Sequence, residues 1–400
     1  MSFMTDNTAI SRVYRLLDRL GPLVAMLAVW GLFAALRWNT FATWENTQSI
    51  LLQTAVVGIA ALGATIIIIS GGIDLSVGSL IALVSVVVAL VLKKLAGSGA
   101  GQAGSHPDVA AGLAAITGIA LAGLCGLAIG SMVVGRLGRV TACVSAGLGA
   151  LIAWNHGFQG WQGWTAVAAG AAVAVGAWWV DRRLKPPLVL SPFIVTLGTW
   201  GAFRGIAKGL ANNSAVYPDA PTRLNHFMQL PQAKVDASLV WQPWQWWSPG
   251  VWVFLALAVA VAALLRYTQF GRHVYAIGSN EQTARLCGIH VERTKLKIYT
   301  LALVLAGVAG VLQFSFNTMG DPTTAAGYEL KVIAAVVIGG ASLSGGVGSV
   351  AGTVAGALMM TIIDNGCTKA GLENWMQEIL TGGIIIAAVA LDQLRHRAKA

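Results

Sequence analysis

The sequence is built from apolar runs, most of them close to the length that crosses a bilayer. A spanning helix needs about 20 mostly apolar residues, and ten runs approach this, near 21–37, 48–69, 76–92, 109–134, 191–209, 250–266, 298–317, 331–342, 350–365 and 376–391. Two further runs lie at 140–155 and 163–180. Because 56% of the residues are hydrophobic and only 10% are charged, the chain lacks the polar surface of a soluble domain. The sequence predicts an all-α polytopic membrane protein with about ten core transmembrane helices and an inserted helical pair.

The few charged residues are unevenly distributed. With the N-terminus placed in the cytoplasm and the spans alternating, five segments face inward: 1–20, 135–140, 181–190, 267–297 and 392–400. Together with Arg266 they hold 17 of the 26 Lys and Arg residues but only 6 of the 16 Asp and Glu residues. Inner loops of membrane proteins carry such a positive excess, so we expect both termini to be cytoplasmic. The net charge of +10 is therefore a topology signal, and nucleic acid is not an expected partner.

These features divide the chain into five parts. Residues 1–20 form a cytoplasmic N-terminal segment, and 21–139 form a first transmembrane half. An inserted hydrophobic hairpin covers 140–186. The second transmembrane half covers 187–392 and contains the cytoplasmic loop 267–297, and 393–400 is a cytoplasmic tail.

Two glycine-rich interruptions resemble one another. Residues 66–79 read IIIISGGIDLSVGS and residues 334–349 read AAVVIGGASLSGGVGS, and the match aligns Gly71-Gly72 with Gly339-Gly340. The predicted topology gives both the same orientation, which favours an internal parallel repeat with broken helices, as in many transporters. A four-residue glycine spacing follows the second break, typical of close helix contact, at Gly348, Gly352 and Gly356.

Embedded polar residues are candidates for lining a solute pathway. They are Asp74, Ser76, Asn317, Ser342 and Ser344. Asp74 has two interpretations, because a carboxylate in apolar surroundings is often functional, whereas one at a helix start caps backbone amides. Capping of a re-entrant turn is the favoured one. Glu329 and Asp364, near the outer ends of predicted spans, are expected to be solvated.

The inner segment 266–295 predicts a short exposed helix. Ser279 or Asn280 is a suitable N-cap and Gly288 a suitable C′ residue, so we expect 281–287 to be helical. Such a helix is marginal in water by itself. It either docks against a partner or belongs to an ordinary solvated loop, and the residues favour neither; the docking anchors would be Arg285, Leu286 and Ile289.

Several enzyme classes find no support. The sequence contains no GxxxxGK[ST] motif, so the chain supplies no ATP-binding P-loop. Gly340-Ala341-Ser342-Leu343 has the GxSx form of an intramembrane serine protease, but all six histidines fall in predicted loops or tails, away from that serine. The four cysteines lack metal-ligand spacing, and no metal site is expected. The alternative function is an ion-coupled secondary transporter or channel, disfavoured because Asp74 is the only good embedded ionisable candidate.

Four strings carry a family resemblance: GGIDLSVGS at 71–79, SPFIVTLGTWGAFRGIAKG at 191–209, FGRHVYAIGSNEQTARLCGIHVERTKLKIY at 270–299, and GYELKVIAAVVIGGASLSGGVGSVAGTVAGAL at 327–358. They resemble the ribose/xylose/galactoside-type permease subunits of bacterial ABC sugar importers, and the third looks closest to xylose permeases. The resemblance covers nearly the whole chain except the termini and about 140–186.

The resemblance implies a non-enzymatic permease subunit that translocates a monosaccharide, either a pentose such as xylose or ribose or a hexose, across the bacterial inner membrane. It implies a second permease subunit, with a homodimer favoured, a cytoplasmic ABC ATPase dimer and a periplasmic sugar-binding protein. ATP and Mg²⁺ would be used by the ATPase, and this chain would hold no cofactor. The coupling helix seated in the ATPase would comprise Gly278, Ser279, Asn280, Glu281, Ala284, Arg285, Leu286, Gly288 and Ile289.

The sequence departs from the family pattern at two single positions. Lys331 stands where an acidic or neutral residue is usual, and Ala341 stands where Thr is usual. Lys331 would either change the charge preference for the solute or snorkel towards the membrane surface.

Overall fold

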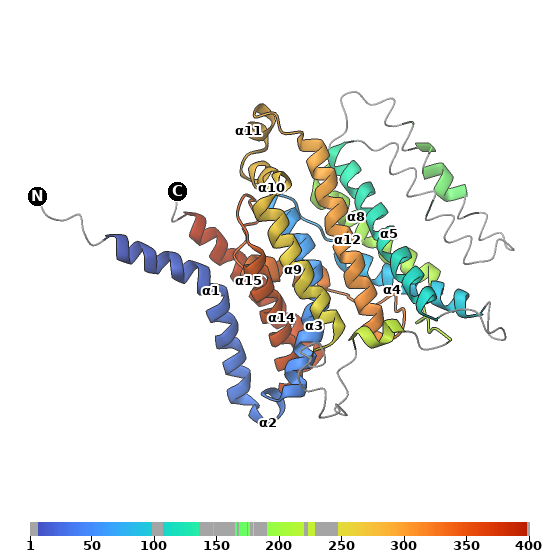
Figure 1. Cartoon of the computed structure of the whole chain (residues 1–400), viewed down its shortest axis with the longest axis horizontal. Helices are drawn as coiled ribbons and strands as arrows, with labels where there is room; N and C mark the ends of the chain where they lie inside the picture. The colour runs from blue at the N-terminus through green and yellow to red at the C-terminus, as the bar shows by residue number, and fades with distance from the viewer. Residues whose placement is uncertain are drawn as a thin grey trace, which may run out of the picture.

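The described part of the chain is a bundle of α-helices. The computed structural model describes residues 7–97, 107–135, 190–219, 223–228 and 247–397, with a few isolated positions between 147 and 179, and no β-strand forms within these ranges. The helices are α1 (Asn7–Leu36), α2 (Trp38–Phe41), α3 (Trp44–Ile69), α4 (Val77–Gly97), α5 (Pro107–Val134), α8 (Pro192–Leu210), the 3-10 helix η1 (Arg223–Met228), α9 (Pro249–Tyr267), α10 (Gln269–Ser279), α11 (Glu281–Leu286), α12 (Val291–Asn317), α13 (Tyr328–Ile338), α14 (Val350–Ala370) and α15 (Asn374–Arg397). Figure 1 shows α2 at one end of the bundle and α10 and α11 at the opposite end.

The prediction of an all-α polytopic membrane protein is confirmed. Six of the described helices are long and apolar enough to span a membrane, namely α3, α4, α5, α9, α12 and α14. Shorter apolar stretches occupy Gly21–Leu36 in α1 and Trp375–Ala387 in α15. The predicted span 331–342 is instead the 11-residue helix α13, too short to cross a bilayer. The predicted inserted pair at 140–155 and 163–180 lies largely outside the described residues.

Helix α12 lies at the centre of the bundle. It packs against α3, α4 and α5, and its Tyr299 and Phe314 are among the largest fully buried side chains. Glycines allow the close approach, because a Cβ at Gly126 of α5 would lie 2.8 Å from the Cα of Thr300. Since lipid tails are as apolar as the helices, such van der Waals contact is a main source of helix association in a membrane.

The end of α3 is fixed by its own backbone. The N–H of Gly72 donates to the carbonyl of Ile67 at 3.0 Å, and Gly71 takes a φ of +79°. This is the Schellman arrangement, in which glycine supplies the left-handed C′ residue.

Helix α13 ends in the same way, but one residue later than the sequence alignment of the two breaks predicts. The N–H of Ala341 donates to the carbonyl of Val336 at 3.1 Å, and the left-handed residue is Gly340, at φ +88°, while Gly339 keeps a φ of −65°. The helix-end geometry therefore equates Gly340, not Gly339, with the first glycine of the other break.

The predicted glycine contact after the second break is confirmed for Gly352 and Gly356, whereas Gly348 lies before α14 and packs against Ile69 and Ala341. Gly352 of α14 packs directly on the backbone of Gly339, and Gly356 packs on that of Ala335. The antiparallel helices α13 and α14 are therefore in backbone contact. A hydrogen bond of 2.7 Å between the hydroxyls of Thr65 and Thr353 links α14 to α3.

Replacing Gly126 by Ala tests the packing of α5 on α12. The new methyl group would meet the Thr300 Cα and the Tyr299 carbonyl oxygen, both at 2.8 Å, and overpacking costs about 1–3 kcal/mol. Gly112→Ala in the same helix is the matched control, because nothing lies within 4 Å of a Cβ there. We expect thermal unfolding of the purified protein in detergent at a lower temperature for Gly126→Ala than for Gly112→Ala. Equal unfolding temperatures would contradict this packing.

Candidate functional site

The predicted coupling segment contains two helices where the sequence predicted one. Helix α10 precedes α11, and Asn280 between them accepts a hydrogen bond from the N–H of Thr283 at 2.9 Å. Of the two N-caps proposed, Asn280 is therefore the one used. Gly288 takes a φ of +83° as expected for a C′ residue, and the N–H of Ile289 donates to the carbonyl of Ala284 at 3.1 Å.

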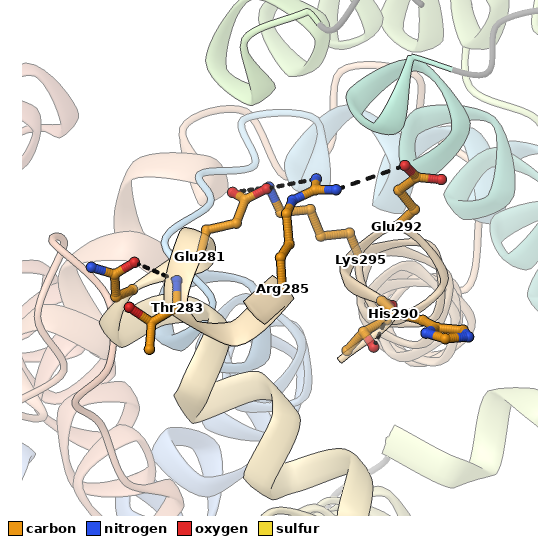
Figure 2. Close-up of polar contacts among 8 residues, drawn as sticks. Glu281, Thr283, Arg285, His290, Glu292 and Lys295 are labelled. Carbon is orange, nitrogen blue, oxygen red and sulfur yellow. Dashed lines mark hydrogen bonds and ion pairs between the residues drawn. The ribbon is translucent and has the colours of Figure 1, made fainter. Parts of the chain in front are cut away.

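An ion-pair network fixes α11 to the start of α12 (Figure 2). The Glu281 carboxylate lies 3.1 Å from the Arg285 guanidinium and 2.7 Å from the Lys295 Nζ, and Arg285 also approaches Glu292 at 3.9 Å. Partial burial raises the pKa of Glu281, but the hydrogen bonds and charges of Lys295 and Arg285 outweigh it, so the pKa lies below its ordinary value. The network gives a six-residue helix the rigidity that it lacks alone.

The side chains of α11 divide into an inner and an outer set. Ala284 is buried and packs in a small apolar cluster with Ile277 and Val291, against which Ile289 is half-buried. Leu286 is 88% exposed, and Arg285 is exposed beside it. Of the predicted anchors, Arg285 and Leu286 are therefore open to a partner, whereas Ile289 mainly supports the helix.

Helix α10 rests on both glycine-rich breaks. The N–H of Gly346 in the second break donates to the carbonyl of Ile69 at the end of α3, at 2.8 Å. Gly278 of α10 packs on this bond, because a Cβ there would overlap the Ile69 carbonyl oxygen and lie 2.6 Å from the Gly346 nitrogen. The Tyr275 hydroxyl donates to the carbonyl of Gly348 at 2.9 Å. The coupling segment and the two broken helices therefore form one junction.

A pocket of about 220 Å³ opens beside this junction. It is lined by both the first break and the coupling segment, including Gly72, Gly278, Asn280, Glu281, Lys295 and Tyr299.

Asp74 lies in the first break with 3% of its surface exposed. Its Oδ1 accepts hydrogen bonds from the N–H and the hydroxyl of Ser76, each at 2.7 Å, and Ser76 is fully buried just before α4. Among the described residues, Asp74 Oδ2 and the Tyr299 hydroxyl are both buried without a hydrogen-bond partner. The geometry of Oδ1 is that of a turn-stabilising side chain.

The remaining predicted pathway residues lie in the second break and at the end of α12. Ser342 and Ser344 bond each other through their hydroxyls at 2.8 Å within the second break. Asn317 ends α12, far along the helix from Tyr299, and donates to the Thr324 hydroxyl at 3.2 Å. Asp74 and Ser76 thus lie in the first break, Ser342 and Ser344 in the second, and Asn317 at the end of α12.

An ion pair inside the bundle was missed by the sequence reasoning. Lys331 of α13 and Asp364 of α14 lie 2.7 Å apart, with side chains 26% and 21% exposed. Lys331 therefore pairs with a carboxylate and does not snorkel, and the expectation that Asp364 is simply solvated was wrong. Glu329 also has a buried carboxylate oxygen. Asp74 is thus not the only embedded carboxylate, so the sequence argument against ion coupling loses its basis.

Comparison with known proteins places the chain among membrane permeases. Residues 137–389 match the family described as branched-chain amino acid transport system / permease component. The ribose import permease protein of Escherichia coli (strain K12) is 30% identical over 98% of this chain and 100% of its own length. The xylose transport system permease protein of Haemophilus influenzae is 31% identical, over 92% and 94%, and the L-arabinose transport system permease protein of Escherichia coli (strain K12) is 29% identical, over 96% and 93%. No solved structure matches.

The pH dependence of stability tests the α11 network. Because the folded-state pKa of Glu281 lies below its ordinary value of 4.5, its ionised form stabilises the fold at every pH above that value. This stabilisation is lost as the pH falls through the folded-state pKa. We expect Glu281→Gln to unfold at a lower temperature than the unmodified protein at pH 7. The loss in the free energy of unfolding should be less than about 1 kcal/mol, because the pairs are partly exposed.

The control for this measurement is Glu292→Gln, which removes the longer contact of 3.9 Å to Arg285. The difference caused by Glu281→Gln should shrink below pH 4.5 and exceed the control difference at pH 7. A difference that grows on acidification would contradict the assigned direction.

Proposed function

The chain belongs to the family of branched-chain amino acid transport system permease components, and on this premise we propose that it forms the membrane path for a monosaccharide in an ATP-driven importer. The observation that supports the sugar is similarity along nearly the whole chain to permeases named for ribose, xylose and L-arabinose. All three are pentoses, so a pentose is the first choice of solute. The relatives are transport permeases and not enzymes, in agreement with the expectation from the sequence.

The energy comes from a partner in this proposal. The sequence holds no P-loop, so ATP and Mg²⁺ are bound by a separate ATPase dimer. A periplasmic sugar-binding protein delivers the solute, and two copies of this chain form the permease in the inner membrane, with both termini in the cytoplasm. The distribution of Lys and Arg supports this orientation.

The residues from Gly278 to Ile289 act as the coupling element. The exposed Leu286 gives an apolar anchor and Arg285 a charged one, which is the combination that a helix uses in a protein groove. The ion pairs of Glu281 and the buried Ala284 hold the helix in one orientation. A partner's movement is then transmitted as a rigid-body displacement.

Helix α10 passes this displacement to the membrane domain. Gly278 packs on the bond between Ile69 and Gly346, so a shift of α10 moves the ends of α3 and α13 together. The contact is between backbones, which lack the freedom of side chains to absorb the movement.

Truncating the anchor tests the docking surface. In proteoliposomes with the ATPase and the binding protein, Leu286→Ala should lower sugar-stimulated ATP hydrolysis about tenfold, because a buried interface anchor is worth more than about 1 kcal/mol. Tyr267→Ala is the matched control, since Tyr267 at the end of α9 is 73% exposed and lies outside the coupling element. Equal loss in both variants, or none in Leu286→Ala, would refute the docking assignment.

Adding a methyl group at Gly278 tests the transmission step. Gly278→Ala must displace α10 from the Ile69 carbonyl, so we expect the ATPase to bind normally while the ratio of sugar transported to ATP hydrolysed falls. Gly112→Ala in α5, where nothing lies within 4 Å of a Cβ, should keep the ratio of the unmodified protein. An unchanged ratio in Gly278→Ala would exclude this junction as the link.

A further inference from the structure

The segment between α12 and α13 is not helical, although it lies beside the middle of a spanning helix. A Cβ at Gly320 would lie 2.7–2.9 Å from atoms of Ser85, Val86 and Ala89, halfway along α4. Left-handed φ values occur at Thr318, Ala325 and Gly327. Irregular backbone at membrane depth is tolerated only where protein buries it or where it lines a water-filled cavity.

Three side chains with hydrogen-bonding capacity gather along this segment. From α8, Trp200 donates its indole N–H to Glu329 Oε1 at 3.1 Å. One turn later on α8, Arg204 donates through Nη1 to the carbonyls of Pro322 and Thr324, at 2.9 and 2.7 Å. Trp200 and Arg204 thus share one face of α8, opposite the first turn of α13.

Arg204, Trp200 and one oxygen of Glu329 retain something to offer a ligand, whereas Glu329 Oε2 is buried. Both hydrogen bonds of Arg204 use Nη1, and within the described residues its Nε and Nη2 make none. The bond between Trp200 and Glu329 Oε1 lies at an exposed position, and the indole is 39% exposed. The hydrogen bond from the indole N–H to Glu329 fixes the orientation of the Trp200 ring.

There is open space beside these groups. A Cβ built at Gly201 or Gly205, each one position after Trp200 or Arg204, would have nothing within 4 Å, and Thr323 and Ala326 of the irregular segment are exposed. A guanidinium and a carboxylate facing lipid would be costly, so water, a solute or protein must cover this face.

We propose that Trp200, Arg204 and Glu329 line the path of the monosaccharide through the membrane, which rests on the proposed function and assigns its solute contacts. The exposed face of the indole stacks on the apolar face of a sugar ring. Glu329 Oε1 accepts from a sugar hydroxyl through the lone pair that the Trp200 N–H does not use, and the free guanidinium nitrogens of Arg204 donate to other hydroxyls. A neutral polyol fits this set, because it presents donors, acceptors and an apolar face together.

Uptake kinetics test these contacts. Proteoliposomes with the ATPase and the binding protein would be assayed with radiolabelled ribose, xylose and L-arabinose. A hydrogen bond to a charged group is worth about 1.5–3 kcal/mol, so Arg204→Gln and Glu329→Ala should raise KM for the best of these sugars by about tenfold or more. Glu329→Gln keeps the acceptor for Trp200 and should retain most of the affinity. Trp200→Ala should change the relative preference among the three sugars.

Trp252→Ala is the matched control, because Trp252 of α9 is 38% exposed and is not one of the proposed contacts. If the unmodified protein takes up none of the sugars with ATP, the proposed function fails. If it does take up sugar and the three α8 and α13 variants keep its KM and preference, the present inference alone fails.

Thiol accessibility tests whether water reaches the face of α8 beside Trp200 and Arg204. With Cys287 and Cys143 replaced by Ser, Gly201→Cys should react with the charged, impermeant reagent methanethiosulfonate ethylsulfonate, and sugar should slow the reaction. Val259→Cys on α9, where the native side chain is 70% exposed, should face lipid and stay unmodified. No reaction at Gly201→Cys, reaction without protection, or equal reaction at Val259→Cys would each overturn the proposal. A disulfide formed between two copies at Gly201→Cys would instead assign the face to a contact between subunits, and would also overturn it.

Discussion

The hydrogen bond between the Gly346 N–H and the Ile69 carbonyl, 2.8 Å long, is the contact on which the arrangement of the helices depends. It joins the two breaks, and Gly278 seats α10 directly on it. Three chain segments far apart in sequence meet there through their backbones, which is possible only because glycine carries no Cβ. In the proposed mechanism, a displacement of α10 acts directly on this point.

Two charged side chains in the described part of the bundle have partners from another element. Lys331 pairs with Asp364 across α13 and α14, and Arg204 binds carbonyls of the irregular segment before α13. A charge in a low-dielectric interior is expensive unless it is paired. The scarcity of charge in the composition and these pairings reflect the same constraint. Asp74 is an exception, because its Oδ1 bonds Ser76 two residues on and its Oδ2 is buried without a partner.

The features that the sequence predicted correctly are local ones. Asn280 as N-cap and Gly288 as C′ residue depend on atoms within a few positions along the chain, and local backbone chemistry alone decides them. The apolar spans were equally readable from length. The pairs Lys331–Asp364 and Trp200–Glu329 were not, because their members are 33 and 129 positions apart and no local pattern marks them. Sequence similarity identified the two breaks as equivalent, but it aligned them one residue away from the structural equivalence. The reason is that φ at Gly340 and Gly339 depends on how the helix ends.

The sequence by itself determined the membrane class, the family and the helix ends of the coupling segment, because hydropathy, long ordered motifs and capping residues act over short stretches of chain. The tertiary structure decided which polar residues meet. It separated Asn317 from Asp74, placed Gly278 on the junction of the breaks and brought Trp200 to Glu329. The physical reason is that burial and pairing of charge are properties of packed helices, and helix packing in a membrane is set by where small residues allow two backbones to touch.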